Sequence, residues 1–448
     1  MISWKAQTEI QSPHREFTRT HSHSGQLVFI TIGVLYILFG VLVNELTIAF
    51  WLDVDSLGLY SRLVIRALDL AAITWGVLTI RYRRRTLIAN TNLSLITTVL
   101  LVLSIEGMLH AFPRLLGDTF ANGVLTKYST KPGGIYYFDP VLRMNFMLPS
   151  YSAEMAYNGY HWHHQTDQYG FRNHESRTKA DILLLGDSHT YGHGLEMEQT
   201  VGFFLEQLTG RTVYNLGRQG DSSLQEAYLL TEQIARLQPR VVLYLFCEND
   251  IRDLYAYRTD SELQKFIETP VNDITYPPRM NVLSAIKRRD EENAEKMHPS
   301  SLLDVIRQRS YLVKVYDWNQ FIKKEQAFAT RISDQDHDEN NATSIGWRYT
   351  KQAIAYMNNV AVQHEAKFII VPVPAMNKRL IAILKDIAVE QALPLIDTAS
   401  LDPSDSSNAV FFLPRDGHLS ERGAKAMAAL ISEQLAKNTS ISSQAIFN

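Results

Sequence analysis

The chain has 448 residues and a formal net charge of −3, with 46% hydrophobic and 20% charged residues. This length predicts more than one domain, and the net charge gives no signal of nucleic-acid binding, so no nucleic-acid partner is expected. The single cysteine, Cys247, excludes an intramolecular disulfide framework.

Three apolar stretches occupy the N-terminal part of the chain, and the first is long enough to cross a hydrocarbon core of about 30 Å. They are Leu27–Phe50, about Leu63–Ile80 and about Leu87–Leu109. The second stretch carries Arg66 and Asp69, which are three positions apart and can pair on one helix face. These two charges leave an interfacial or buried helix as the alternative to a membrane span.

Basic residues between the second and third stretches indicate an orientation. The run Arg81-Tyr82-Arg83-Arg84-Arg85 is predicted to be cytoplasmic by the positive-inside rule. We therefore expect residues 1–25 to be a cytoplasmic tail, residues 26–110 a transmembrane region of about three helices, and the rest to lie outside. The first stretch is too long for a secretory signal and is followed by Trp51-Leu52-Asp53 rather than a small-residue cleavage site, which favours a retained anchor.

Residues 111–164 are rich in Tyr, Pro and Gly and have no clear helical period. They are predicted to form an extended connector that wraps the following domain. The tract His161-Trp162-His163-His164 resembles a metal-binding run, but no acid or cysteine stands beside it at helical or turn spacing. No metal is expected there.

From about residue 165 onward, apolar strand-like runs alternate with helical patterns, which predicts parallel strands joined by crossover helices. The expected strands are 181–186, 212–216, 240–246, 368–373 and 393–397. The expected helices are 198–209, 222–237, 344–364, 376–391 and a closing helix from about Ser420. Ligands bind at the carboxyl ends of the strands in such sheets, so the loops that follow them are candidate site loops.

The first expected strand ends on Gly186-Asp187-Ser188, which puts a hydroxyl at the rim of the sheet. A serine hydroxyl is a weak nucleophile at neutral pH and needs an imidazole within hydrogen-bond reach to take its proton. The alternative for a lone Gly-Asp-Ser is a turn that caps a helix, with the serine as N-cap.

Two further strands deliver polar loops to the same edge. The strand at 212–216 runs into a glycine-rich turn, where Gly220 allows a backbone N–H to approach a substrate closely. The apolar run at 240–246 is followed by Cys247-Glu248-Asn249-Asp250, and the Asn249 amide is a candidate side-chain donor. These two loops are expected to stabilise an oxyanion.

An insertion of about ninety residues, 251–342, follows the Asn249 loop and exceeds the usual loop length. It includes the charged stretch Arg288–Lys296, and we expect it to be a lid or an acceptor-binding element. Residues Asp334–Glu339 have the first alternating acids of a calcium loop but lack its turn glycine, and Ile345 replaces its closing glutamate. A solvated acidic loop is therefore predicted.

Asp416-Gly417-His418 lies just ahead of the closing helix. His418 is the candidate base for Ser188 because a late histidine can return to the rim of a parallel sheet. Asp416 is the candidate carboxylate that orients the imidazole and stabilises its charge.

The four segments around Ser188, Gly220, Asn249 and His418, in this order, resemble the SGNH (GDSL-type) hydrolase family. The resemblance covers residues 165–436 with the insertion, leaves 437–448 as a C-terminal tail, and includes the lead-in Asp167–Asn173, which is similar to that of many bacterial members. It implies a flavodoxin-like three-layer α/β/α sandwich, Ser188 as nucleophile, His418 as base and Asp416 as its orienter. It also implies an oxyanion hole made by the Ser188 and Gly220 N–H groups and the Asn249 amide.

Two positions depart from the family pattern. Cys247 stands where the third segment usually has glycine, and the carboxylate is two residues before His418 rather than three, where Arg415 lies. The shorter Asp-x-His spacing resembles polysaccharide O-acetyltransferase relatives of the family.

The resulting hypothesis is a membrane-anchored bacterial serine esterase in the inner membrane, with its catalytic domain in the periplasm; a eukaryotic luminal protein is the alternative location. It would cleave O-acyl groups of an envelope glycan or lipid through an acyl-enzyme, without cofactor or metal, and with envelope biosynthesis proteins as possible partners. The alternatives are an O-acyltransferase that uses a sugar hydroxyl as acceptor, and a membrane-tethered binding module without turnover.

Side chains next to the site residues are expected to have supporting roles. Asp187 and Asp250 are predicted to hold loops by hydrogen bonds, and Cys247 to be a small buried thiol, because nothing basic flanks it. For His189 and His193, a substrate-lining role and a plain loop position are both open.

Overall fold

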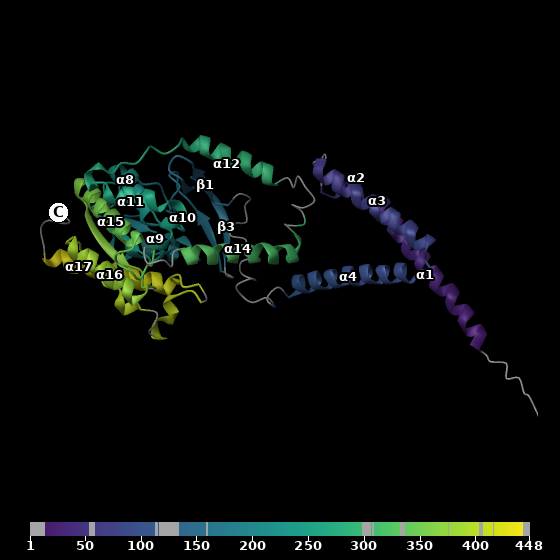
Figure 1. Cartoon of the computed structure of the whole chain (residues 1–448). Coiled ribbons are helices and arrows are strands. Elements are labelled where there is room, and N and C mark those ends of the chain that lie inside the picture. The colour runs from purple at the N-terminus through teal and green to yellow at the C-terminus, as the bar shows by residue number, and fades with distance from the viewer. Residues whose placement is uncertain are drawn as a thin grey trace, which may run out of the picture. The chain divides into compact units, whose positions relative to one another are not determined.

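The structure is a computed structural model that describes residues 14–52, 59–112, 115, 134–157, 160–297, 306, 309–331, 337–374, 376–402, 406–414 and 416–441. The chain divides into two compact units, shown in one cartoon in Figure 1. The first comprises Met1–Gly117 with Ala294–Asp317, and the second comprises Asp118–Asn293 with Trp318–Asn448.

The first unit contains four helices in its described N-terminal part: α1 (His14–Leu42), α2 (Glu45–Leu52), α3 (Leu59–Arg81) and α4 (Thr86–Ala111). Three segments are long and apolar enough to cross a membrane, namely Gly25–Leu42, Leu59–Arg81 and Thr86–Ala111. The first apolar stretch is not continuous as expected, because Asn44 ends α1 and starts α2. Its Oδ1 accepts the backbone N–H of Leu46 at 2.9 Å and of Thr47 at 3.2 Å, which are otherwise orphan donors of a helix start.

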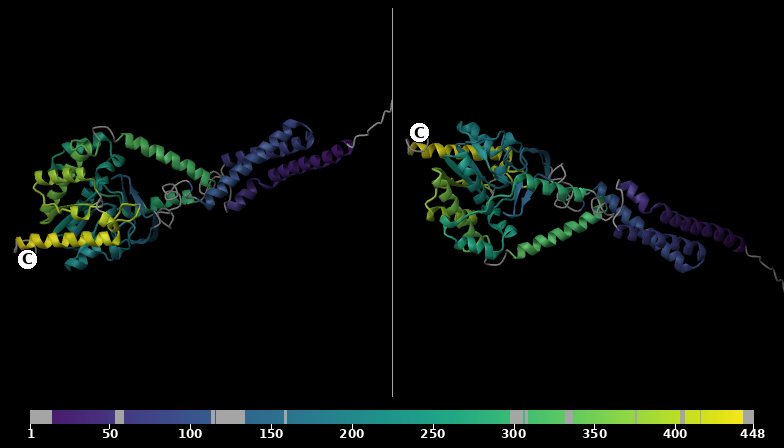
Figure 2. Two further views of the ribbon diagram at one scale, coloured as in Figure 1. Left: turned by 90° about the horizontal axis from the view of Figure 1, so that it is seen from below. Right: turned by 90° about the horizontal axis from the view of Figure 1, so that it is seen from above.

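Helices α1 and α3 pack side by side, as Figure 2 shows. Glycines permit this contact, since a Cβ added to Gly76 would lie 2.5 Å from the carbonyl oxygen of Gly33. The charge on α3 is paired differently from the prediction. Arg66 binds Glu45 of α2 at 2.6 Å rather than Asp69 of its own helix, because the side chain of Glu45 reaches it across the helix contact.

In the second unit, four parallel strands form one sheet: β5 (Ile182–Gly186), β6 (Val213–Asn215), β7 (Val241–Phe246) and β8 (Lys367–Pro372). Their spatial order is β6-β5-β7-β8. The expected strand at 393–397 is reduced to a single parallel bridge between Leu395 and Ile370, because Pro394 has no N–H to donate at this edge. Counted along the chain, the order is the 2-1-3-4-5 of flavodoxin-like folds, which confirms the predicted α/β class.

Alternating side chains of the sheet face two separate cores, as a sheet covered on both faces requires. On one face they pack against α8 (Ser223–Leu237), α15 (Ile345–Gln363) and α16 (Lys378–Glu390), and Figure 1 shows α8 and α15 as neighbours. On the other face they pack against α7 (Val201–Thr209) and α17 (Glu421–Ile441). Helix α17 continues to Ile441, five residues past the expected domain end at 436.

Residues 134–165 form two antiparallel hairpins where an extended connector was predicted. The strands β1 (Tyr136–Asp139) and β2 (Met144–Met147) pair with each other, as do β3 (Ser152–Tyr157) and β4 (Tyr160–Gln165). Every second side chain is buried, so the hidden period is that of a strand rather than a helix. Phe146 joins the main core and Trp162 a smaller one, so this segment belongs to the domain. Most of residues 111–133 lie outside the described part of the chain.

The described part of the insertion consists of α9 (Asn249–Arg252, which starts just before it), α10 (Leu254–Tyr257), α11 (Asp260–Glu268), a 3-10 turn η3 (Val271–Asp273), α12 (Val282–Met297) and α14 (Tyr311–Arg331). Helix α11 packs along α15 through Leu263 and Phe266, on the outer layer of the sandwich. Residues 334–336 of the predicted acidic loop, 334–339, lie outside the described residues, and in its described half His337 lies 2.9 Å from Asp260.

Candidate active site

Ser188 begins the short helix α6 (Ser188–Tyr191) at the carboxyl end of β5. Asp187 is the N-cap of this helix, since its carboxylate accepts the N–H of His189 at 2.9 Å. This is the loop-holding role expected of Asp187, whose Oδ2 also accepts a longer hydrogen bond of 3.3 Å from the Ser188 hydroxyl. Ser188 Oγ lies 2.8 Å from Nε2 of His418.

His418 and Asp416 stand on a tight turn ahead of α17. Phe412 and Leu419 form an antiparallel bridge across it, and Gly417 takes a φ of +81°, which favours glycine. Nδ1 of His418 hydrogen-bonds Asp416 Oδ1, so the Asp-x-His spacing does bring the two groups together. The Asp416 side chain is 1% exposed, whereas that of His418 is 22% exposed.

The two expected oxyanion loops lie at the strands on either side of β5. Gly220, after β6, has a φ of +74° with open space where a Cβ would stand, and its carbonyl accepts the Tyr257 hydroxyl at 3.3 Å. Asn249 starts α9 after β7, and its Nδ2 donates to Asp253 at 3.3 Å. Because the order is β6-β5-β7, the three loops meet at one edge of the sheet.

All five predicted site residues line one pocket of about 510 Å³. Its other lining side chains are mostly polar and include Tyr157, His189, His193, Gln219, Glu248 and Arg252. Arg252 is the lining residue from the expected lid, 251–342, within the described part of the chain. Within the described insertion, α11 and η3 instead pack on α15.

Two further imidazoles lie against His418. The ring centroids of His193 and His189 are 4.3 Å and 4.8 Å from that of His418. Burial lowers the pKa of His189 to about 4, with Asp187 acting in the opposite direction and His418 adding to the lowering. Burial, followed by the neighbouring His418, also lowers the pKa of His193 to about 4. Both rings are therefore neutral at pH 7.

Ligand atoms of His193, Asp416 and His418 lie within 4.8 Å of one another, a spacing that can hold a metal ion. Both ring nitrogens of His418 are already engaged, one with Ser188 and one with Asp416. This arrangement fits a proton relay better than a metal site. In the 161–164 tract, His164 points inward to the Tyr191 hydroxyl at 2.7 Å and His163 pairs with Glu154 at 2.9 Å, so strand alternation separates them.

Cys247 is buried, and burial raises the pKa of its thiol well above the usual value, as expected for an inert cysteine. Asp250 accepts the N–H of Cys247 and the hydroxyl of Tyr244, both at 3.1 Å. Asp250 therefore holds the loop after β7 by hydrogen bonds, as predicted.

Sequence reasoning missed the hairpin β3–β4 as a wall of the site. Tyr157 lines the pocket, and the Tyr160 hydroxyl donates to the carbonyl of Pro414 at 2.7 Å, next to the histidine turn. Arg172 fixes the hairpin to the end of α6, since its guanidinium donates to the carbonyls of His163, Tyr191 and Gly192 at 2.8–3.1 Å. The signal in the sequence was the period-two placement of large side chains such as Trp162 and His164.

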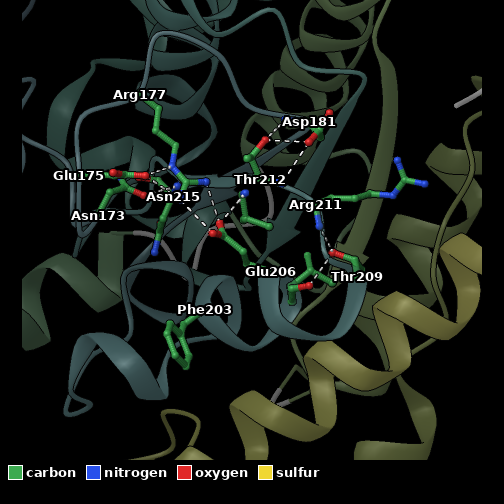
Figure 3. Close-up of polar contacts among 12 residues, drawn as sticks. Asn173, Glu175, Arg177, Asp181, Phe203, Glu206, Thr209, Arg211, Thr212 and Asn215 are labelled. Carbon is green, nitrogen blue, oxygen red and sulfur yellow. Dashed lines mark hydrogen bonds and ion pairs between the residues drawn. The ribbon is translucent and has the colours of Figure 1, made fainter. Parts of the chain in front are cut away.

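Asparagines tie the nucleophile turn to the neighbouring loops. Asn173 and Asn215 exchange two hydrogen bonds of 2.9 and 3.0 Å, and Figure 3 shows them beside the Arg177–Glu206 pair. The Asn215 amide also donates to the carbonyl of Thr190 at 2.7 Å and accepts the N–H of Gly217 at 2.8 Å. It thereby links the Ser188 helix to the Gly220 loop.

Comparison with known proteins gives likenesses of fold. The sequence matches no protein-family model and no curated protein. A lipolytic protein of the G-D-S-L family from Desulfitobacterium hafniense is 14% identical over 57% of this chain and 99% of that chain, with a TM-score of 0.31. A lipase/acylhydrolase from Enterococcus faecalis is 14% identical over 57% and 95%, with a TM-score of 0.32.

A third similar structure, a lipolytic protein of the G-D-S-L family from Veillonella parvula, is 13% identical over 56% of this chain and 96% of that chain, with a TM-score of 0.30. Two of these three structures are described as lipolytic proteins of the G-D-S-L family, which is the family that the sequence resembles, and the third as a lipase/acylhydrolase. At such identities and TM-scores the likeness says nothing about substrate, and the functional proposal rests on the geometry of the site.

Proposed function

We propose that the protein is a membrane-anchored serine esterase. One observation carries the proposal: Ser188 Oγ lies 2.8 Å from Nε2 of His418, whose other ring nitrogen bonds the buried Asp416 carboxylate. A hydroxyl, an imidazole and a carboxylate in this sequence of hydrogen bonds form the arrangement that activates a serine.

The reaction has two steps. Ser188 attacks the ester carbonyl carbon while its proton passes to His418 Nε2, and N–H groups of Ser188, Gly220 and Asn249 stabilise the oxyanion. The carbon–oxygen bond to the alcohol then breaks, and the alcohol leaves with the proton from His418. Water attacks the acyl-serine with His418 as base, which releases the acid and restores the hydroxyl.

The polar lining supports a substrate with several hydroxyl groups, such as an O-acylated envelope glycan or the headgroup region of a lipid. Gln219, Glu248 and Arg252 offer both donors and acceptors at the pocket wall. The same lining supports the second candidate, an O-acyltransferase in which a sugar hydroxyl replaces water. That enzyme needs a partner protein to supply its acyl donor.

The proposed location is the bacterial inner membrane, with the catalytic unit in the periplasm. Three helices of sufficient length and the run Arg81–Arg85 between the second and third support this topology. A chain with one cysteine needs no oxidative pairing there.

The proposal is tested by labelling the full chain in detergent with a fluorophosphonate probe and measuring intact mass. We expect one adduct on the wild type, none on Ser188→Ala, and strongly reduced labelling of His418→Ala. Ser284→Ala, at an exposed serine of α12, is the matched control and should label like the wild type. No adduct on the folded wild type would contradict the esterase and favour the binding module.

A further inference from the structure

His193 is held in the site by its backbone. It lies between Gly192 and Gly194, whose φ values of +83° and +76° form a turn that favours glycine. The His193 N–H donates to the carbonyl of Ser188 at 3.0 Å, so the loop closes back onto the nucleophile. The residue is only 3% exposed, which is unusual for a plain loop position.

The imidazole of His193 lies against both His418 and Asp416. Its ring stacks on His418 with centroids 4.3 Å apart and planes at 28°. Its Nε2 lies 3.8 Å from Asp416 Oδ2, while Oδ1 of that carboxylate bonds His418. Asp416 therefore faces one imidazole with each oxygen. Trp162, at 4.8 Å, covers another part of the His193 ring.

The position of the His193 proton follows from these neighbours. A neutral ring carries one proton, and its Nδ1 lies 2.9 Å from Oε1 of the Gln219 amide. With the proton on Nδ1, the lone pair of Nε2 would face the Asp416 carboxylate, which is repulsive. With the proton on Nε2, the N–H faces the carboxylate, and the Gln219 amide turns its NH₂ group to Nδ1. The second arrangement avoids the repulsion and keeps the Gln219 hydrogen bond.

We infer that His193 is a positioning residue that acts through Asp416 and His418, and that the serine relay of this protein has four members. The inference rests on the proposed function. The Nε2–H of His193 restrains Oδ2 and reduces the affinity of Asp416 for a proton, while the stacked ring fixes the plane of His418. Because His193 is neutral, His418 can take up the serine proton without a second cation beside it.

Other titratable groups lie near His193 and His418 and must be kept constant in a test. Asp416 and His418 act on His193 directly, and Arg172 acts from the β4 side. His189 lies next to His418, and Asp187 lies next to Ser188. A substitution that changes only His193 leaves all of them in place.

The test compares His193→Phe with His193→Gln in the full chain in detergent, by the pH dependence of the fluorophosphonate labelling rate. Phenylalanine keeps the stacked ring but has no N–H, so His418 should hold its proton more tightly. The acid limb of the profile is expected to move up by about one pH unit, which is about a tenfold lower rate at a pH on that limb. Glutamine can still donate to Oδ2 and should restore most of this shift.

His174→Phe is the control, since His174 is an exposed histidine paired with Glu198 and should leave the profile unchanged. A role in packing alone would slow labelling equally at all pH values. An unshifted acid limb in His193→Phe, or a glutamine variant no better than phenylalanine, would overturn the inference.

A second measurement does not depend on reactivity. Long-range ¹H–¹⁵N NMR of the full chain labelled with ¹⁵N-histidine reports which ring nitrogen is protonated, with the His193 signals assigned by their loss in His193→Phe. We expect an Nε2–H tautomer, and an Nδ1–H tautomer would refute the inference. If the wild type is not labelled by the probe at all, the proposed function fails, and the tautomer still decides the role of His193.

Discussion

Asn249 has an amide whose two ends have different surroundings. Nδ2 donates to Asp253 at 3.3 Å, and Oδ1 is buried without a hydrogen-bond partner in the described part of the chain. The second Nδ2 proton is thus available for an oxyanion. We expect Asn249→Ala to lower kcat by about 10²–10³ with little change in KM, because the lost bond forms mainly in the transition state.

The matched variant is Asp253→Asn, which keeps the shape of the neighbour but changes its charge. Steady-state hydrolysis of p-nitrophenyl acetate should fall by less than tenfold in this variant, since Asp253 only orients the amide. Equal losses in both variants would assign the effect to the α9 loop as a whole, and not to a donor at position 249.

At the scale of elements, Arg172 connects β4 to the loop that follows α6. It is 2% exposed and donates to backbone carbonyls of both segments, and its guanidinium lies 4.8 Å from the ring centroid of Tyr191. Burial lowers the pKa of Arg172, and no carboxylate hydrogen-bonds its guanidinium among the described residues. The segment 167–173 thus has a structural role, because it positions the Arg172 guanidinium between the two segments.

We expect Arg172→Met to lower the free energy of unfolding by about 3 kcal/mol or more, because several buried carbonyls lose charged donors at once. Chemical unfolding of the full chain in detergent, followed by tryptophan fluorescence, measures the change. Lys179→Met, at an exposed position just before β5, is the control and should change stability by less than about 0.5 kcal/mol. A small effect at Arg172 would mean that water replaces its donors.

The elements that the sequence predicted well are those with an unambiguous pattern. The apolar runs at β5 and β7 are buried on both faces, so their composition alone indicates central parallel strands. The hairpins of residues 134–165 were missed because tyrosine and histidine occupy buried strand positions there. Their polar groups obscure the alternation of apolar and polar residues that marks a strand. The prediction of a full edge strand near Leu395 was wrong for another reason, since the sequence does not distinguish a strand from a single bridge.

The gathering of the candidate site residues at one edge of the sheet was predictable from the same strands. Ser188, Gly220 and Asn249 each follow a strand of the sheet, and topology brings such loops together whatever their separation in sequence. Tyr157 and His193 were not assignable, because their place depends on a hairpin and on a left-handed turn that only tertiary contacts specify.

At the scale of the whole molecule, buried acids behind the site make stability depend on pH. Burial raises the pKa of Glu226 and of Asp250 well above the usual value, and the nearby Asp187 carboxylate raises both further. Burial also raises the pKa of Asp221 to about 7, although Arg218 opposes this. The folded state therefore keeps protons that the unfolded chain releases above about pH 4.

Because the unfolded state then binds fewer protons, stability falls as pH rises from about 4 toward the raised values. Glu226→Gln removes one such group at almost constant volume. Relative to the wild type, it should gain up to about 1.4 kcal/mol of unfolding free energy per pH unit between pH 5 and 7, measured by chemical unfolding at several pH values. Glu365→Gln, at an exposed turn, is the control, and a difference independent of pH would contradict the assignment.

The proposed three-span topology can be tested by cysteine labelling, because the chain has a single native cysteine. Cys247 is buried and its thiol has a raised pKa, so a maleimide reacts slowly with the native chain. New cysteines are placed one at a time at Ser3, Thr86 and Gln207, the last two being exposed. With three spans, Ser3→Cys and Thr86→Cys lie in the cytoplasm with the arginine run, and Gln207→Cys lies outside.

An impermeant maleimide should therefore label only Gln207→Cys in intact spheroplasts, and only the other two in inverted vesicles. If α3 lay in the interface instead of spanning, two crossings would remain, and Ser3→Cys would report the same side as Gln207→Cys. With two spans, the N-terminal tail and the second unit lie on the same side of the membrane. The tail and the arginine run could then not both be cytoplasmic while the second unit lies outside. The relation between positions 3 and 207 thus tests the α3 span directly, whatever the outcome at the active site.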